Sequence, residues 1–306
     1  MTEGNTSDPI DARVQVRLGD LVALEAAARR GRRRGGQPAA TLPGAHAGVR
    51  RGRGMDYLES RAYQSGDDAR HLDWRLTARS GRPHTKVFHE ERDHKLMLLL
   101  DQHPSMRFAT RGCFKSVQAA RAAALLAWHT AHAGGRVGAL AFGACRQAVP
   151  AMAQRRGALA VCGALARWDA ARDAAGPEPL AEALTRLRPL AGGGSRLVLV
   201  TDGRSAGPRL QATLAAWRRR ARLSVLLVVD ALEQDTPPPG VYPLQVGDRI
   251  TRLDLTANAA RSAFRETMRA PAERMRAVGA ALGIPVVTLT TMQDPCDGVR
   301  AWLERP

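Results

Sequence analysis

The sequence predicts an α/β protein with a doubly wound, mostly parallel sheet, preceded by an N-terminal helix and an extended segment. Residues 96–100 form an unbroken apolar run, which is typical of a strand buried on both faces of a parallel sheet. A second such run covers residues 197–200. Apolar residues recur at helical spacing between such runs, and strands that alternate with helices indicate a parallel, doubly wound sheet.

The other elements follow from apolar spacing and stop signals. Residues 14–30 and 114–132 have the spacing of helices, and Gly134 and Gly135 end the second one. Strands are expected over residues 137–142, 196–200, 224–229 and 285–289, with a short antiparallel edge at 146–150. Helices are expected over residues 158–168, 180–187, 210–222 and 258–282, the last one interrupted at Pro271 because proline lacks an amide donor.

Length and composition narrow the class of protein. The 306 residues suffice for one large domain with an appendage. We see no apolar run long enough to span a bilayer and no signal-peptide core near the N-terminus, so we expect a cytoplasmic protein. The four cysteines form no Cys-x-x-Cys pair, which favours isolated buried thiols over zinc ligands or disulfides.

The net charge of +17 raises the question of nucleic-acid binding. Lys86, Lys95 and Lys115 are the only lysines, and this skew toward arginine resembles the codon bias of a GC-rich genome. Aromatic residues for base stacking are also scarce, so we do not expect nucleic acid as the partner. The arginines between residues 29 and 53 form either a solvated linker or an arm that grips an acidic partner.

Polar side chains follow both apolar runs directly. Asp101, His103 and Ser105 come after the first run, and Asp202 comes after the second. Ligands of open α/β sheets bind beyond the carboxyl ends of the strands, so we expect these side chains to converge at one rim. Carboxylates and hydroxyls are ligands for a hard cation such as Mg²⁺. The alternative is that Ser105 caps a helix and the carboxylates bind loop amides.

This pattern resembles the metal-ion-dependent adhesion site of von Willebrand factor A domains, whose first motif is Asp-x-Ser-x-Ser. Asp101 and Ser105 match that motif, and His103 stands at its first Ser. Glu178 stands where the family has a Thr before Pro-Leu, and Asp202 matches the later Asp. The resemblance implies a degenerate site that holds Mg²⁺ through Asp101, Ser105 and Asp202, with Glu178 and His103 as further candidate ligands.

Asp101, His103 and Ser105 also raise the question of a hydrolase. A working triad needs the His between the other two groups, with its two nitrogens facing different partners. Here the three residues lie on a single turn, and the sequence has no Gly-x-Ser-x-Gly motif. We therefore expect no catalytic residues.

The segment from residue 52 to 91 is rich in charge and carries a more specific pattern. It contains an Arg-x-Tyr, a Gly-Asp, a further Arg, an Asp-Trp and an Ala-Arg before a strand. This pattern resembles the signature of the bacterial family called domain of unknown function 58, on residues Arg61, Tyr63, Gly66, Asp67, Arg70, Asp73, Trp74, Ala78 and Arg79.

The likeness extends over about residues 45 to 290 and implies three parts. Residues 1–54 would be an N-terminal helix and Arg-rich linker. Residues 55–94 would be the signature segment, packed on a von Willebrand factor A-like domain at residues 95–306. In the signature we expect an internal network of Asp67, Arg70, Asp73 and Arg79 around a buried Trp74, and the alternative is a docking surface.

Members of this family are often encoded beside a MoxR-type AAA+ ATPase. The resemblance implies a non-catalytic interaction module that serves such an ATPase, and other von Willebrand factor A proteins, as an adaptor or co-chaperone. A nucleic-acid-binding protein that uses the Arg-rich arm is the first alternative. A metal-dependent hydrolase is the second.

Overall fold

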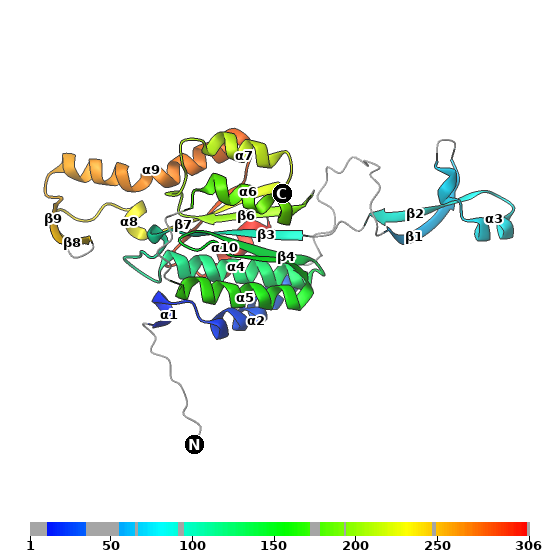
Figure 1. Ribbon diagram of the computed structural model, residues 1–306, viewed down its shortest axis with the longest axis horizontal. Helices are drawn as coiled ribbons and strands as arrows, with labels where there is room; N and C mark the ends of the chain where they lie inside the picture. The colour runs from blue at the N-terminus through cyan, green and yellow to red at the C-terminus, as the bar shows by residue number, and fades with distance from the viewer. Residues whose placement is uncertain are drawn as a thin grey trace, which may run out of the picture. The chain divides into compact units, whose positions relative to one another are not determined.

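A six-stranded sheet with helices on both faces forms the larger part of the computed structural model (Figure 1). The structure describes residues 11–34, 55–64, 67–90, 95–171, 178–192, 194–246 and 249–304. The chain divides into two compact units, Ala39–Asp93 and the remainder, Met1–Pro38 with His94–Pro306. Packing of the smaller unit on the larger one stays a prediction.

The strand order of the large sheet is β10-β7-β6-β3-β4-β5. All neighbours are parallel except β4 and β5, which are antiparallel. The chain order of the first strands reverses at β3, which pairs with β4 on one side and β6 on the other, so the predicted doubly wound sheet is confirmed. The strands are β3 (Lys95–Gln102), β4 (Arg136–Gly143), β5 (Ala148–Ala153), β6 (Arg196–Thr201), β7 (Arg222–Val229) and β10 (Val286–Thr290).

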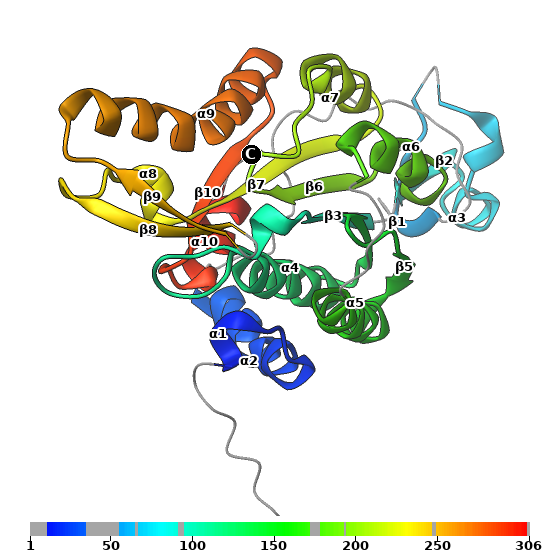
Figure 2. The ribbon, with the colours of Figure 1, turned by 60° about the vertical axis from the view of Figure 1, so that its left-hand side comes forward.

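The two faces of the sheet carry separate cores because neighbouring side chains of a strand point to opposite faces. Leu98 and Leu100 pack in one core, and Met97 and Leu99 pack in the other. One face is covered by α4 (Lys115–His132), α5 (Gln154–Ala170) and α10 (Pro295–Leu303). The opposite face, seen in Figure 2, is covered by α6 (Leu180–Ala191), α7 (Leu210–Arg218) and α9 (Asn258–Leu282).

The predicted N-terminal helix is divided into α1 (Asp11–Val14) and α2 (Leu18–Arg34). The α2 helix packs on α4 and α5, and its Leu21 side chain is fully buried there. The Trp128 indole N–H of α4 donates to the Leu21 carbonyl oxygen at 3.0 Å. This helix is therefore part of the large unit, while the arginines at 50, 51 and 53 lie outside the described residues.

Several expected helices differ in extent, since α5 begins at Gln154 instead of residue 158 and α6 ends at Ala191 instead of residue 187. The helix predicted over residues 210–222 ends at Arg218, because Arg222 already begins β7. The α9 helix continues through Pro271 without interruption, since Ala272, Met275 and Gly279 bury its inner face and compensate for the lost hydrogen bond. Gly203 packs against this helix so closely that a Cβ atom there would lie 2.8 Å from the Pro271 carbonyl oxygen.

Several short elements were not expected from the sequence. They are the turn η2 (Pro104–Met106), the helix α8 (Ala231–Gln234) and the hairpin of β8 (Val241–Val246) and β9 (Arg249–Asp254). The smaller unit is a second hairpin, β1 (Met55–Ala62) with β2 (His84–Glu90), whose connection holds η1 (Ala69–His71) and α3 (Trp74–Ser80).

All four cysteines are free thiols, as predicted, and the expected burial holds for Cys113, Cys145 and Cys162 but not for the half-buried Cys296. Among the described residues, no helix has the length and apolar content needed to cross a bilayer.

Removal of the Leu21 side chain tests the packing of α2. We expect Leu21→Ala to lower the free energy of unfolding by about 2–5 kcal/mol, because it leaves a cavity against α4. Urea denaturation measures this change. Leu18→Ala is the matched control on the same helix, since Leu18 is 47% exposed. Equal effects of the two substitutions would contradict the packing of α2 described here.

Candidate functional site

The predicted convergence of polar groups at one rim of the sheet is confirmed. Asp101 lies near the end of β3, Asp202 directly follows β6, and these strands are parallel neighbours in which Leu100 pairs with Val200. The Thr201 hydroxyl donates to Asp101 Oδ2 at 2.6 Å across the two strands. The two carboxylates therefore belong to one crevice at the carboxyl end of the sheet.

Asp101 is completely buried, and both of its oxygens are occupied by hydrogen bonds. Oδ1 accepts from the His103 amide at 3.0 Å and from His103 Nδ1 at 2.7 Å. Oδ2 accepts from the hydroxyls of Thr201 and Ser205, each at 2.6 Å. Four donors within the chain thus satisfy this carboxylate, as the burial of a charge requires.

His103 is the charge partner of Asp101. The hydrogen bond to Asp101 raises the pKa of His103, partial burial opposes the rise, and the negative charges of Asp101, Asp202 and Glu178 add to it. The ring also contacts Phe142 edge-on, with 5.6 Å between ring centroids. His103 is therefore held in the position where the adhesion-site motif has its first Ser, and it points its Nδ1 hydrogen at the carboxylate.

Asp202 is paired with a lysine that the sequence analysis did not assign to the site. Lys115 Nζ lies 2.8 Å from Asp202 Oδ2 and 2.8 Å from Glu233 Oε1, and all three side chains are buried. Arg204 also lies 3.3 Å from Glu233, and its amide donates to Asp202 Oδ1. We call the Asp202–Lys115–Glu233 group the lysine clamp. One signal was available, since Lys115 is one of three lysines in an arginine-rich chain.

Asp230 positions the acidic end of the lysine clamp. It caps α8 in a capping box with Glu233, whose Oε2 accepts from the Asp230 amide at 2.9 Å. Asp230 also accepts from Thr110 and from the Thr291 hydroxyl. Burial raises the pKa of Asp230, but these hydrogen bonds outweigh it, so its pKa is lowered and the carboxylate stays charged.

Glu178 and Ser105 do not join a ligand set. Glu178 is buried and bound in a two-pronged ion pair by Arg186, whose Nε and Nη2 lie 3.0 and 2.8 Å from its oxygens. The Ser105 hydroxyl is buried in η2 and forms no hydrogen bond with any described residue. His103, and not Ser105, occupies the cap position of η2, so the capping role considered for Ser105 is wrong.

The candidate metal ligands of the crevice are not free to coordinate a Mg²⁺ ion in this arrangement. The oxygens of Asp101 are saturated, and Asp202 and Glu178 already face cationic side chains. No group of three or more His, Cys, Asp or Glu residues in the described part of the chain has the arrangement of a metal site. Mg²⁺ binding stays a prediction of the sequence, and the contacts of these five residues weigh against it.

The same contacts bear on catalysis. His103 Nδ1 faces Asp101, while the Ser105 hydroxyl makes no bond to the imidazole or to any other described group. A nucleophile activated by a base requires a direct hydrogen bond between the two. This pair therefore lacks the geometry of an activated serine.

The smaller unit separates the signature residues into two groups. Asp67 accepts from Arg61 at 2.7 Å and from the Gln64 amide, and its pKa is lowered first of all by the Arg61 hydrogen bond. Asp73 caps α3 and accepts from the Ser60 hydroxyl at 2.7 Å, a bond that lowers its pKa. Both carboxylates are thus satisfied inside the smaller unit, but by Arg61, Ser60 and backbone amides and not by Arg70 or Arg79.

The other signature residues do not take part in these bonds. Trp74 is 70% exposed, so the smaller unit itself does not bury it, and its predicted burial against the larger unit stays a prediction. Arg70 and Arg79 are exposed too, Tyr63 is half-buried, and Gly66 lies outside the described residues. A seven-residue helix beside a two-stranded hairpin offers too little apolar surface to bury an indole.

Comparison with known proteins assigns the family. The family model described as "Protein of unknown function DUF58" matches residues 59–277, which is more than half of the chain. This chain belongs to the DUF58 family. The predicted family is therefore confirmed, and its model spans most of the signature segment and most of the sheet.

Curated relatives of this DUF58 protein include the uncharacterized proteins Mb1516 of Mycobacterium bovis and Rv1480 of Mycobacterium tuberculosis. Each is 40% identical over 116 residues, which cover 38% of this chain and 37% of the relative. The match thus spans little more than a third of the length of these relatives.

Solved structures with a similar arrangement include BatB from Bacteroides thetaiotaomicron and a von Willebrand factor type A protein from Catenulispora acidiphila. The TM-score is 0.41 for both, at 13% and 12% identity. The similarity covers 69% of this chain and 97% of BatB, and 72% of this chain and 43% of the Catenulispora protein.

Replacement of Lys115 tests the lysine clamp. We expect Lys115→Met to lower the free energy of unfolding by about 3–5 kcal/mol, because Asp202 and Glu233 then remain buried without the ammonium group. Urea denaturation at neutral pH measures the change. Lys95→Met, at the start of β3, is the control, and a loss no larger than that of the control would contradict the clamp.

The raised pKa of His103 predicts a dependence of stability on pH. A raised pKa adds stability in full below the ordinary value of 6.5, and this contribution disappears as the pH rises through the raised value. The free energy of unfolding of the wild type, relative to His103→Gln, should therefore fall from mildly acidic to mildly alkaline pH. Urea denaturation over this range measures it, and parallel curves for the two proteins would refute the pairing with Asp101.

Proposed function

We propose that this DUF58 protein is a non-catalytic interaction module that serves a MoxR-type AAA+ ATPase as an adaptor or co-chaperone in the cytoplasm. The observation that carries the proposal is the internal pairing of the crevice. Asp101, Asp202 and Glu178 each have a partner within the chain, so none of them is free to act as a base. These paired carboxylates stabilise the fold, and we propose that the protein acts by binding a partner through its surface.

The smaller unit supplies a surface with the composition of a docking site. Trp74, Arg75 and Arg79 are exposed on α3, and Arg70 is exposed on η1 just before it. Tryptophan and arginine are enriched among the residues that dominate binding energy at protein interfaces. The internal bonds of Asp67 and Asp73 fix the local backbone that presents these side chains. We therefore propose that the ATPase contacts α3.

Removal of the Trp74 side chain tests this docking surface. We expect Trp74→Ala to weaken binding of a MoxR-type ATPase from the same organism by about thirtyfold or more, because a central aromatic contact is lost. The melting temperature should not change, since Trp74 is largely exposed. Co-purification and titration of the purified proteins measure the binding. Ile250→Ala is the matched control, because Ile250 is a 75% exposed apolar residue of the other unit.

Further arms of the experiment separate the alternatives. Equal ATPase recovery with wild type and Trp74→Ala would contradict docking through α3. Loss of binding in EDTA, with recovery in Mg²⁺, would restore the expected metal site as the contact. Recovery of DNA or RNA in place of the ATPase, with a steep dependence on salt, would favour the nucleic-acid alternative.

A further inference from the structure

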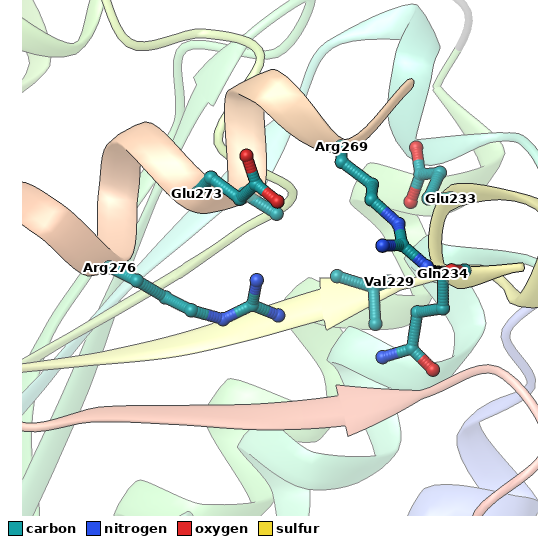
Figure 3. A pocket seen from close by; sticks show the side chains of 7 residues that line it. Val229, Glu233, Gln234, Arg269, Glu273 and Arg276 are labelled. Carbon is teal, nitrogen blue, oxygen red and sulfur yellow. Dashed lines mark hydrogen bonds between the residues drawn. The ribbon is translucent and has the colours of Figure 1, made fainter. Parts of the chain in front are cut away.

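A cavity of about 230 Å³, which Asp101 does not line, lies between α9, α8 and the end of β7 (Figure 3). Val229 of β7 and Ala272 of α9 give it an apolar part of the lining. Its walls are polar, and four charged side chains stand among them. The lining residues are Val229, Glu233, Gln234, Arg269, Ala272, Glu273 and Arg276.

Two arginines give the cavity its chemistry. Arg269 and Arg276 are seven residues apart on α9, which places both on the face turned toward the sheet. Figure 3 shows their guanidinium groups reaching from α9 toward Val229 and Gln234. Both side chains are partly buried, which removes water from them in part and strengthens their attraction for an anion.

Most hydrogen-bond donors of these arginines are unused within the described structure. Arg269 donates to the Gln234 carbonyl oxygen, and Arg276 Nη2 donates to the Thr288 hydroxyl at 3.3 Å. Each guanidinium group carries five N–H donors in a planar fork. Neither one forms an ion pair with a carboxylate among the residues that the structure describes.

The carboxylates around the cavity do not fully neutralise its two arginines, and one positive charge remains. Glu233 is already bound by Lys115 and lies 3.3 Å from Arg204, so its charge is offset outside the cavity. Glu273 is exposed on α9 and contributes one negative charge. Two guanidinium groups and one carboxylate therefore give the cavity a net charge of +1. A singly charged anion matches this better than a phosphate with two charges.

We propose that this cavity binds a carboxylate side chain from an acidic segment of a protein partner. The two oxygens of a carboxylate match the planar fork of a guanidinium group, and the apolar lining of Val229 and Ala272 suits the methylene groups of a Glu side chain. This proposal rests on the proposed function only for the identity of the protein partner. Carboxylate binding itself can be tested without the ATPase.

The test uses a fluorescein-labelled polyglutamate peptide, with binding followed by fluorescence anisotropy at moderate salt. We expect the double substitution Arg269→Gln with Arg276→Gln to weaken binding by about tenfold or more, because both forks are lost. Arg265→Gln with Arg274→Gln is the matched control, since these arginines are exposed on α9 and do not line the cavity. Its affinity should change by less than about twofold.

Two further measurements keep the proposal open to refutation if the double variant unfolds. Arg276→Lys keeps the charge and removes the fork, so it should also weaken peptide binding. The Nε–H signals of Arg269 and Arg276 in the NMR spectrum of the wild type should shift when the peptide is added.

Three outcomes would overturn the proposal. Equal losses in the cavity and control variants would mean unspecific attraction to the net charge of +17. If inorganic phosphate displaced the peptide at a lower concentration than acetate did, the cavity would be assigned to phosphate. Unchanged arginine signals would exclude the cavity as the binding site. Failure of the proposed function would appear separately, as loss of ATPase binding while the peptide still binds.

Discussion

A single buried ammonium group holds the carboxyl end of the sheet together. Lys115 begins α4, Asp202 follows β6 and Glu233 lies in α8 after β7, so the lysine clamp joins three connections that are far apart in the sequence. Asp230 extends the same network to Thr110 and to Thr291 after β10. Buried charges cost several kcal/mol each unless they are paired. The loops of this rim are therefore held as a set, and the crevice of Asp101 takes its shape from them.

The sequence predicted the sheet and the meeting of Asp101 with Asp202, because buried parallel strands leave continuous apolar runs and their carboxyl ends share one rim. It did not predict how the charges at that rim are satisfied. The pairs of Lys115 with Asp202 and of Arg186 with Glu178 depend on side-chain direction and on contacts over long stretches of chain. The hairpins were missed for another reason, since β1 and β9 carry charged residues and β8 is interrupted by Pro243.

The signature residues of the DUF58 family serve two different purposes in this chain. Asp67 and Asp73 bind within the smaller unit, and they organise the turn and the helix that follow β1. Trp74, Arg70 and Arg79 face outward from that framework. A motif of paired opposite charges around a tryptophan thus predicts burial only where enough apolar surface lies beside it. The six-stranded sheet offers such a surface, and the two-stranded hairpin does not.

The contact between Gly203 and Pro271 has a mechanical consequence. The turn after β6 and the middle of α9 touch backbone to backbone, with no side chain between them that could yield. Closely packed protein interiors transmit displacement and do not absorb it. A force applied to α9 would therefore be transmitted directly to the turn that carries Asp202. The helix and the rim of the sheet would respond to an applied force together.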